Sequence, residues 1–225
     1  MIQFLLAAPN SGSGKTTLAC ALLAALKNRG YAPCAFKCGP DYIDPMFHRA
    51  VLGVESHNLD LFFSSPETAR GLYASGAAGH GAAVCEGAMG FYDGLSGTST
   101  TASAWQVADT LNLPVLLVVR PKGASLTLAA QIKGLQSFRT PSHLAGILLN
   151  DCKPGLYKML APMLEAETGL PVAGFLPPVP EAAIGSRHLG LYTAGEVADL
   201  QQKIALLAEY ADLLVVMEDG AVRFA

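Results

Sequence analysis

The stretch QFLLAAPNSGSGKTT, residues 3–17, decides the fold. A short apolar run is followed by a loop of small residues and glycines, and then by a lysine and two threonines. Residues 17–27, which come next, have helical spacing. A strand, a glycine-containing loop and a helix in this order are typical of a phosphate-binding loop, in which backbone N–H groups and a helix amino terminus surround a phosphate.

This loop predicts ATP and Mg²⁺ as cofactors. Lys15 supplies a mobile cation for the outer phosphates, and Thr16 offers its hydroxyl to Mg²⁺. Because the strict pattern has glycine where Pro9 stands, the loop is a variant, but an ordinary Gly/Ser turn is disfavoured because strand, loop and helix all agree. The predicted nucleotide contacts are Ser11, Gly12, Ser13, Gly14, Lys15, Thr16 and Thr17.

The rest of the chain alternates short apolar runs with helical patterns. Strands are predicted at residues 3–8, 34–37, 82–85, 115–119, 144–149, 172–175 and 213–217, and helices at 17–27, 66–74, 102–111, 126–136, 156–167 and 196–211. Continuous apolar runs suit parallel strands covered on both faces. We therefore expect an α/β fold with a doubly wound, mostly parallel sheet of the P-loop NTPase type, as one domain over residues 1–225.

Composition excludes several classes of protein. Hydrophobic residues make up 51% of the 225 residues and charged residues 15%, which excludes a disordered chain. A net charge of −3 predicts no nucleic-acid or membrane partner, and no apolar run is long enough to span a bilayer. No basic segment precedes the first apolar run, so a cytoplasmic location is expected. The five cysteines form no CxxC pair, and the interpretation of Cys85 as a nucleophile is disfavoured because no activating set accompanies it.

Two acidic segments follow the second and third predicted strands. KCGPDYIDPMFH, residues 37–48, places Lys37 at a strand end, followed by two carboxylates and a histidine in a loop that Pro40 and Pro45 constrain. CEGAMGFYDG, residues 85–94, places Glu86 at the end of the next strand. Phosphoryl transfer requires a metal ion, carboxylates near the phosphates and a further cation, so we expect both segments to face the phosphate loop.

Five motifs carry a more specific resemblance. APNSGSGKTT, KCGPDYIDPMFH, EGAMGFYDG, GILLN and GFLPPVPEAAIGSRHLGL resemble, in order and spacing, the amidoligase domain of the cobyrinic acid a,c-diamide synthase family, within the dethiobiotin synthetase-like group of P-loop proteins. Members of that family use ATP and Mg²⁺ to phosphorylate the a and c acetate carboxylates of a corrinoid precursor, and ammonia then attacks each acyl phosphate. The resemblance implies a ligase of cobalamin-type cofactor biosynthesis.

The resemblance also implies roles for individual residues. The implied metal ligands are Thr16, Asp41 and Glu86. The implied catalytic residues are Lys15, Lys37, Asp41, Asp44 and Asp93, and Lys37 would neutralise charge at the reacting carboxylate. The implied substrate contacts are Tyr42, His48, Tyr92 and His188, and the implied nucleotide contacts beyond the loop are Asn150 and Arg187. The family usually has an acidic residue where Arg120 stands and a basic one where Asp151 stands. We therefore predict that this exchange of signs preserves a pair.

The implied partners are a tetrapyrrole dicarboxylate and ammonia. Typical members continue into a glutaminase domain, so ammonia is expected from solution or from a separate or missing glutaminase domain. The macrocycle stays open between a cobalt corrinoid, hydrogenobyrinate and a nickel sirohydrochlorin, and the weak candidates for binding its carboxylates are Arg49, Lys122, Arg187 and His48. A homodimer is a further option. The alternatives are a dethiobiotin synthetase-like ligase, which the GPDYIDP segment disfavours, and a non-catalytic ATP-binding regulatory module.

Overall fold

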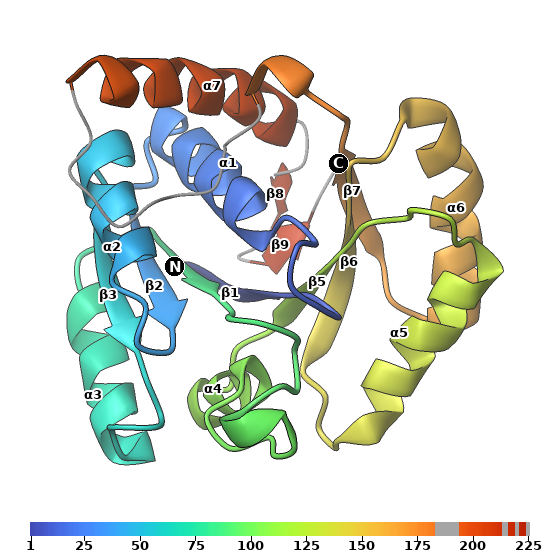
Figure 1. The fold of residues 1–225 in the computed structure, drawn as a ribbon, viewed down its shortest axis with the longest axis horizontal. Coiled ribbons are helices and arrows are strands. Elements are labelled where there is room, and N and C mark those ends of the chain that lie inside the picture. Colours follow the sequence, from blue (N-terminus) through green and yellow to red (C-terminus); the bar gives the residue numbers. More distant parts are fainter. Residues whose placement is uncertain (183–193, 213–215, 219–220, 224–225) are drawn as a thin grey trace.

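The computed structural model describes residues 1–182, 194–212, 216–218 and 221–223. Its centre is a seven-stranded parallel sheet with the strand order β3-β2-β4-β1-β5-β6-β7 (Figure 1). The strands are β1 (Ile2–Ala7), β2 (Pro33–Cys38), β3 (Glu55–Leu59), β4 (Ala82–Glu86), β5 (Val115–Val119), β6 (Leu144–Asn150) and β7 (Val172–Leu176). The chain winds from β1 to one edge, returns through β4, and then crosses to the other edge. The predicted doubly wound α/β fold is confirmed.

Helices cover both faces of this sheet. One face carries α1 (Lys15–Asn28), α2 (Ile43–Phe47), the π-helical turn η1 (His48–Leu52) and α7 (Ala194–Asp212). The other carries α3 (Pro66–Ala77), α4 (Ala104–Leu111), α5 (Leu126–Phe138) and α6 (Pro154–Thr168). Two short 3₁₀ turns, η2 (Leu95–Gly97) and η3 (Pro180–Ala182), lie in connections. None of these described helices is long and apolar enough to cross a membrane.

The central strand shows why the apolar runs are continuous. Phe4 and Leu6 of β1 pack into the cluster under α1, whereas Leu5 and Ala7 pack into the cluster on the opposite face. Successive side chains of a strand alternate between faces, so a strand with helices on both sides needs apolar residues at every position. From Phe4 to Ala7 β1 is such a strand, and both its neighbours are parallel, whereas Gln3 near its start is exposed.

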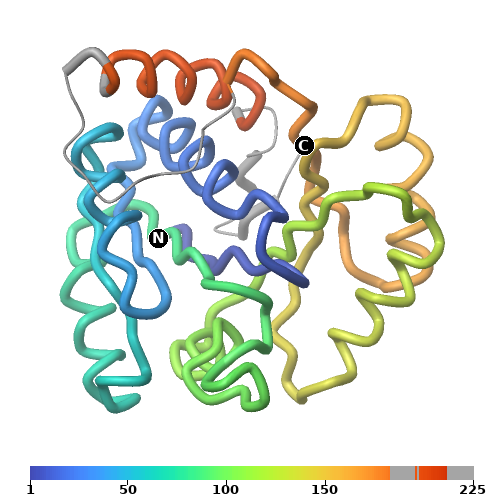
Figure 2. The backbone as a smooth tube through the Cα atoms, in the orientation of Figure 1, coloured from blue at the N-terminus to red at the C-terminus, as the bar shows by residue number. Residues whose placement is uncertain are grey.

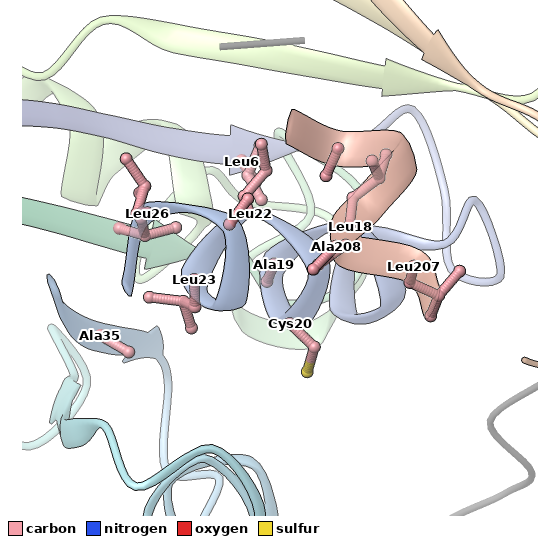
Figure 3. Packing of buried hydrophobic residues seen from close by; sticks show 14 of the residues in the cluster. Leu6, Leu18, Ala19, Cys20, Leu22, Leu23, Leu26, Ala35, Leu207 and Ala208 are labelled. Carbon is pink, nitrogen blue, oxygen red and sulfur yellow. The ribbon is translucent and has the colours of Figure 1, made fainter. Parts of the chain in front are cut away.

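Helix α1 is buried on more than one side. Every residue from Leu18 to Leu23 is buried, because the helix lies between the sheet and α7. Figure 3 shows Leu18 and Leu22 of α1 together with Leu6 of β1 and with Leu207 and Ala208 of α7. Figure 2 shows α7 running across α1. The helix that follows the glycine loop is therefore held firmly, which fixes the position of the loop.

Three local expectations were wrong or incomplete. Strand β3 was not predicted, because its sequence ESHNL is polar and it forms one edge of the sheet. The segment after Tyr42, expected as a loop, forms α2 and η1 instead. In the predicted strand 213–217, residues 213–215 lie outside the described residues, and β8 (Val216–Glu218) pairs antiparallel with β9 (Ala221–Arg223) in a separate sheet.

Candidate active site

The glycine loop after β1 is tightened by a side chain from β6. Gly12 and Gly14 have φ values of +79° and +92°, a region that favours glycine. The amide of Asn150 donates to the Ser13 carbonyl at 2.9 Å, and a Cβ on Gly14 would lie 1.9 Å from Asn150 Nδ2. Asn150 therefore holds the loop backbone through a direct contact. One N–H of its amide is used by the loop, and the further contact of Asn150 with a nucleotide stays a prediction.

Helix α1 begins at Lys15 with no acidic residue in its first turn, so its amino terminus presents uncompensated positive potential. Lys15 Nζ donates to the Met89 carbonyl, and lies 3.4 Å from the Asn10 carbonyl. Burial, together with the nearby Lys37, lowers the pKa of Lys15. Lys15 thus connects the phosphate loop to the segment after β4.

Glu86 stands at the centre of the site. It ends β4, where its backbone is in register with Leu6 of β1 and with Lys37 of β2. Glu86 Oε1 accepts a hydrogen bond from Thr16 Oγ1 and another from Lys37 Nζ at 2.8 Å. The side chain is 1% exposed, and its Oε2 has no hydrogen-bond partner among the described residues. The predicted convergence of Thr16, Lys37 and Glu86 is present in the structure.

Lys37 is buried between two carboxylates. Its Nζ lies 2.7 Å from Asp44 Oδ2 and 2.8 Å from Glu86 Oε1, and its side chain is only 6% exposed. Burial alone would lower the pKa of Lys37, but Glu86 and Asp44 outweigh it and raise that pKa. Burial would likewise raise the pKa of Glu86, but the charge and hydrogen bond of Lys37 lower it, with Thr16 and His48 adding to the effect. The group is therefore an ionised, internally paired cluster.

The loop after β2 is fixed by four hydrogen bonds that involve two side chains, those of Asp41 and Asn58. Asp41 Oδ1 accepts from the backbone N–H groups of Ile43 at 2.9 Å and Asp44 at 3.3 Å, which starts α2. Asn58 of β3 donates to the carbonyls of Gly39 at 2.9 Å and Asp41 at 2.7 Å. Tyr42, between these contacts, is 72% exposed. Sequence reasoning missed Asn58, because only the unpredicted strand β3 brings it beside this loop.

Several residues implied by the resemblance have other partners in the structure. Asp44 is buried against Lys37 in α2, and His48 is 1% exposed with Nδ1 3.0 Å from Ser56 Oγ, so neither lies in an open loop. Tyr92 donates its hydroxyl to the Leu135 carbonyl and packs against Trp105 and Phe138. Asp93 Oδ2 accepts from Gly90 N at 3.1 Å and so shapes the turn after β4. Arg187 and His188 lie outside the described residues.

The candidates for binding carboxylates of the substrate differ in their surroundings. Arg49 donates to the Ser56 carbonyl, at 3.1 Å from Nε, and Lys122 is exposed. Arg120 pairs with Asp151, with Nε 2.7 Å from Oδ2 and Nη2 also in contact. The predicted pair across the ends of β5 and β6 is thus formed. Burial raises the pKa of Cys38 to about 12 and the pKa of Cys85 well above its usual value, which disfavours a thiolate at either position.

The residues at this site fit Mg²⁺ bound together with a nucleotide. No group of three His, Cys, Asp or Glu side chains able to hold a metal occurs in the part of the chain that the structure describes. Mg²⁺ at phosphate loops needs none, since it is bound by one or two protein oxygens, substrate phosphates and water. Thr16 Oγ1 and Glu86 supply such oxygens, and the buried Glu86 Oε2, which has no hydrogen-bond partner within the described part of the chain, could accept a cation. Asp41, the third implied ligand, is half-buried and uses Oδ1 within its turn.

Comparison with known proteins gives a consistent result. A family model described as the CobQ/CobB/MinD/ParA nucleotide binding domain matches residues 4–190. The cobyrinate a,c-diamide synthase of Clostridium tetani is 40% identical over 93% of this chain and 47% of its own, and that of Gloeobacter violaceus is 41% identical over 92% and 47%. The hydrogenobyrinate a,c-diamide synthase of Streptomyces coelicolor is 41% identical over 86% and 40%. The chain therefore spans about half the length of these relatives.

Solved structures share the fold. A ParA family ATPase from Chlorobium tepidum superimposes with a TM-score of 0.60 over 93% of this chain and 95% of its own, at 15% identity. Chloroplast FtsY from Physcomitrella patens gives a TM-score of 0.56 over 90% of this chain and 65% of its own, at 14% identity. At these identities the likeness concerns the arrangement of strands and helices alone.

Proposed function

The chain belongs to the family of CobQ/CobB/MinD/ParA nucleotide-binding domains, and on that premise we propose that it is an ATP- and Mg²⁺-dependent amidoligase domain. Its proposed substrate is a tetrapyrrole whose a and c acetate carboxylates become amides, as the names of the relatives at 36–41% identity indicate for those proteins. The observation that carries the proposal is the cluster of Thr16, Lys37 and Glu86 beside the phosphate loop.

The proposed reaction has two steps. A substrate carboxylate oxygen attacks the γ-phosphorus of ATP, and the bond to the bridging oxygen of ADP breaks, which gives an acyl phosphate. The nitrogen of ammonia then attacks the acyl carbon, phosphate leaves with the bonding electrons, and a proton is lost. Phosphorylation is needed because a carboxylate has no acceptable leaving group, whereas phosphate leaves readily.

In this scheme the protein mainly positions groups and neutralises charge. The loop N–H groups and the start of α1 bind the outer phosphates, and Lys15 exchanges the Met89 carbonyl for a phosphate oxygen. Thr16 and Glu86 hold Mg²⁺, which when bound withdraws charge from the phosphates. Lys37, tied to Asp44 and Glu86, keeps the carboxyl end of β2 cationic near the transferred group. The acid substrate is proposed to bind beside Asp41, in the loop after β2.

The direct test supplies the purified chain with ATP, MgCl₂ and cobyrinic acid, and either ammonium chloride or glutamine. We expect acid-dependent ADP release with ammonium, and a product seen by mass spectrometry in which each reacting hydroxyl is replaced by an amino group. ADP release that ignores the acid would favour a nucleotide-binding regulatory module instead. Product formed with glutamine by the purified chain would contradict an external ammonia source.

Two substitutions separate nucleotide binding from turnover. Lys15→Ala should abolish ATP binding, because it removes the cation at the loop. Asp41→Asn should leave ATP binding largely intact and reduce turnover, since an asparagine Oδ1 can still accept from Ile43 N and start α2. Equal loss of ATP binding in both variants, measured by titration with a fluorescent nucleotide, would contradict these roles.

A further inference from the structure

Exposed apolar side chains gather at the carboxyl ends of three adjacent strands. Such side chains follow β2, β3 and β4, which are neighbours in the sheet on the side of the Glu86 cluster. They are Tyr42, Met46, Phe62, Phe63, Met89 and Leu95. Phe62 and Phe63 are 54% and 76% exposed, which is costly for two adjacent phenyl rings unless something covers them.

Hydrogen bonds on both sides hold the segment that contains the two phenylalanines. Their rings meet edge to face with centroids 4.5 Å apart. The Phe62 N–H donates to Asp60 Oδ1 at 2.8 Å on one side, and Ser65 caps α3 on the other by accepting from Thr68 N. Leu61 packs into the core below. Short contacts at both ends of the segment thus fix the aromatic pair as a preformed surface.

The segments that carry these side chains follow strands next to the one that ends at Glu86. Cys38 at the end of β2 is in register with Leu59 at the end of β3, and Asn58 ties the two following loops together. On the other side of β2 lies β4, which ends at Glu86. Neighbouring strands are about 4.8 Å apart, so β3 ends roughly 10 Å from Glu86 across the sheet. Met89 joins the two regions, because its carbonyl accepts from Lys15.

We propose that Phe62 and Phe63, together with Tyr42 and Met89, form a platform that binds the apolar face of the tetrapyrrole while its acetate arms reach the phosphate site. This inference rests on the proposed function. An aromatic pair offers large area for stacking on a flat conjugated ring. The segments 39–47, 60–65 and 87–97 contain no Lys or Arg but do contain Asp41, Asp44, Asp60 and Asp93, so only the apolar face of the ring, and not its carboxylate arms, can be bound favourably here.

Binding through the face of the ring also fits a reaction on two carboxylates. One phosphate loop serves both acetate groups, so the ring must be able to turn between the two reactions. Binding through a ring face fixes the plane of the ring but not its rotation in that plane, unlike a set of ion pairs, which fixes both. The platform therefore predicts strong dependence of substrate affinity on the two rings, with little effect on ATP.

The test compares the double variant Phe62→Ala/Phe63→Ala with Phe138→Ala in the full 225-residue chain. Phe138 is a matched control, since it is 55% exposed but lies at the end of α5 under the opposite half of the sheet. Cobyrinic acid and hydrogenobyrinic acid are the probes, titrated without nucleotide by the change in their visible absorbance. Binding of a fluorescent ATP analogue is measured in parallel.

We expect the double variant to bind both macrocycles at least about tenfold more weakly, whereas Phe138→Ala binds them as the wild-type chain does and ATP affinity is unchanged in both. If the double variant binds both macrocycles as tightly as the wild-type chain does, the platform is wrong, but the proposed function is not affected. A wild-type chain that binds neither macrocycle overturns both. Unchanged affinity with a shift from dimer to monomer in sedimentation would instead assign the surface to contact between copies of this chain.

Discussion

Removing the Lys37 cation while keeping the size of the side chain tests the buried cluster most directly. Lys37→Met leaves Asp44 and Glu86, whose side chains are 4% and 1% exposed, without the ammonium group that now lies 2.7 and 2.8 Å from them. Breaking a buried ion pair from one side costs about 3–5 kcal/mol, because the remaining charge is buried and uncompensated. In a chain of this length such a loss corresponds to a fall in Tm of roughly 6–20 °C.

The loss should depend on pH in a defined direction. In the wild-type chain Lys37 lowers the pKa of Glu86 against the effect of burial, so this contribution to stability is complete above the unfolded pKa of about 4.3 and is lost only as the pH falls through the lowered value. In the variant Lys37 no longer opposes burial, and burial then shifts the pKa of Glu86 upward against the smaller effects of Thr16 and His48. The difference in stability between the two chains should therefore be largest near pH 7.5 and should shrink towards pH 4.5.

Urea denaturation at several pH values measures this difference. Lys203→Met is the matched control: it breaks an ion pair of 2.6 Å to Asp199, but those side chains are 29% and 59% exposed, so a loss under about 1 kcal/mol is expected. If Lys37→Met lowers the free energy of unfolding as little as the control does, the reasoning is refuted. It is also refuted if the free energy of unfolding falls by a large amount that is the same at pH 7.5 and pH 4.5, because the effect would then come from packing and not from charge.

Two further predictions concern the loop and the strand ends. Gly14→Ala should abolish ATP binding in a fluorescent-nucleotide titration, since the new Cβ would lie 1.9 Å from Asn150 Nδ2 at a φ of +92°. Gly12→Ala, whose new Cβ meets nothing within 4 Å, should weaken ATP binding less. Equal effects of the two substitutions would contradict the role of Asn150. Arg120→Ala and Asp151→Ala should be non-additive in thermal unfolding by about 0.3–1 kcal/mol, and the exchange Arg120→Asp/Asp151→Arg should recover part of the loss; additive effects would rule out a contributing pair.

The sequence predicts the buried strands well, because their apolar runs record burial on both faces. It fails at β3, where the sequence ESHNL carries only two fully buried side chains, those of Ser56 and Leu59, and an edge position removes the need for a continuous apolar run. It also fails at α2, whose short helix contains Pro45 and begins through the side chain of Asp41. Such a local capping contact leaves no periodic signal.

The predicted convergence of Thr16, Lys37 and Glu86 is present, but several contacts around these residues were not predicted. The convergence of Thr16 and Glu86 follows from the strand order of a phosphate-loop fold, which places β4 next to β1. The pairing of Lys37 with Asp44 could not be predicted, because Asp44 reaches Lys37 only when α2 folds back over the end of β2. The environment of Tyr92 depends on the packing of α4 and α5, which are far from it in sequence.

The cluster joins the phosphate loop and the segment after β2 in one electrostatic unit. Glu86 contacts Thr16 of the phosphate loop through the same oxygen that accepts from Lys37, and Lys37 in turn holds Asp44, which lies two residues after the exposed Tyr42. A cation bound at Glu86 competes with Lys37 for that carboxylate, so Lys37 then relies more on Asp44. Because Asp44 is an early residue of α2, occupancy of the nucleotide site should alter how firmly the loop before α2 is held. Hydrogen exchange at residues 41–47, measured with and without MgATP, should therefore change even when no acid substrate is present, whereas unchanged exchange there would mean that the two sides of the site are assembled independently.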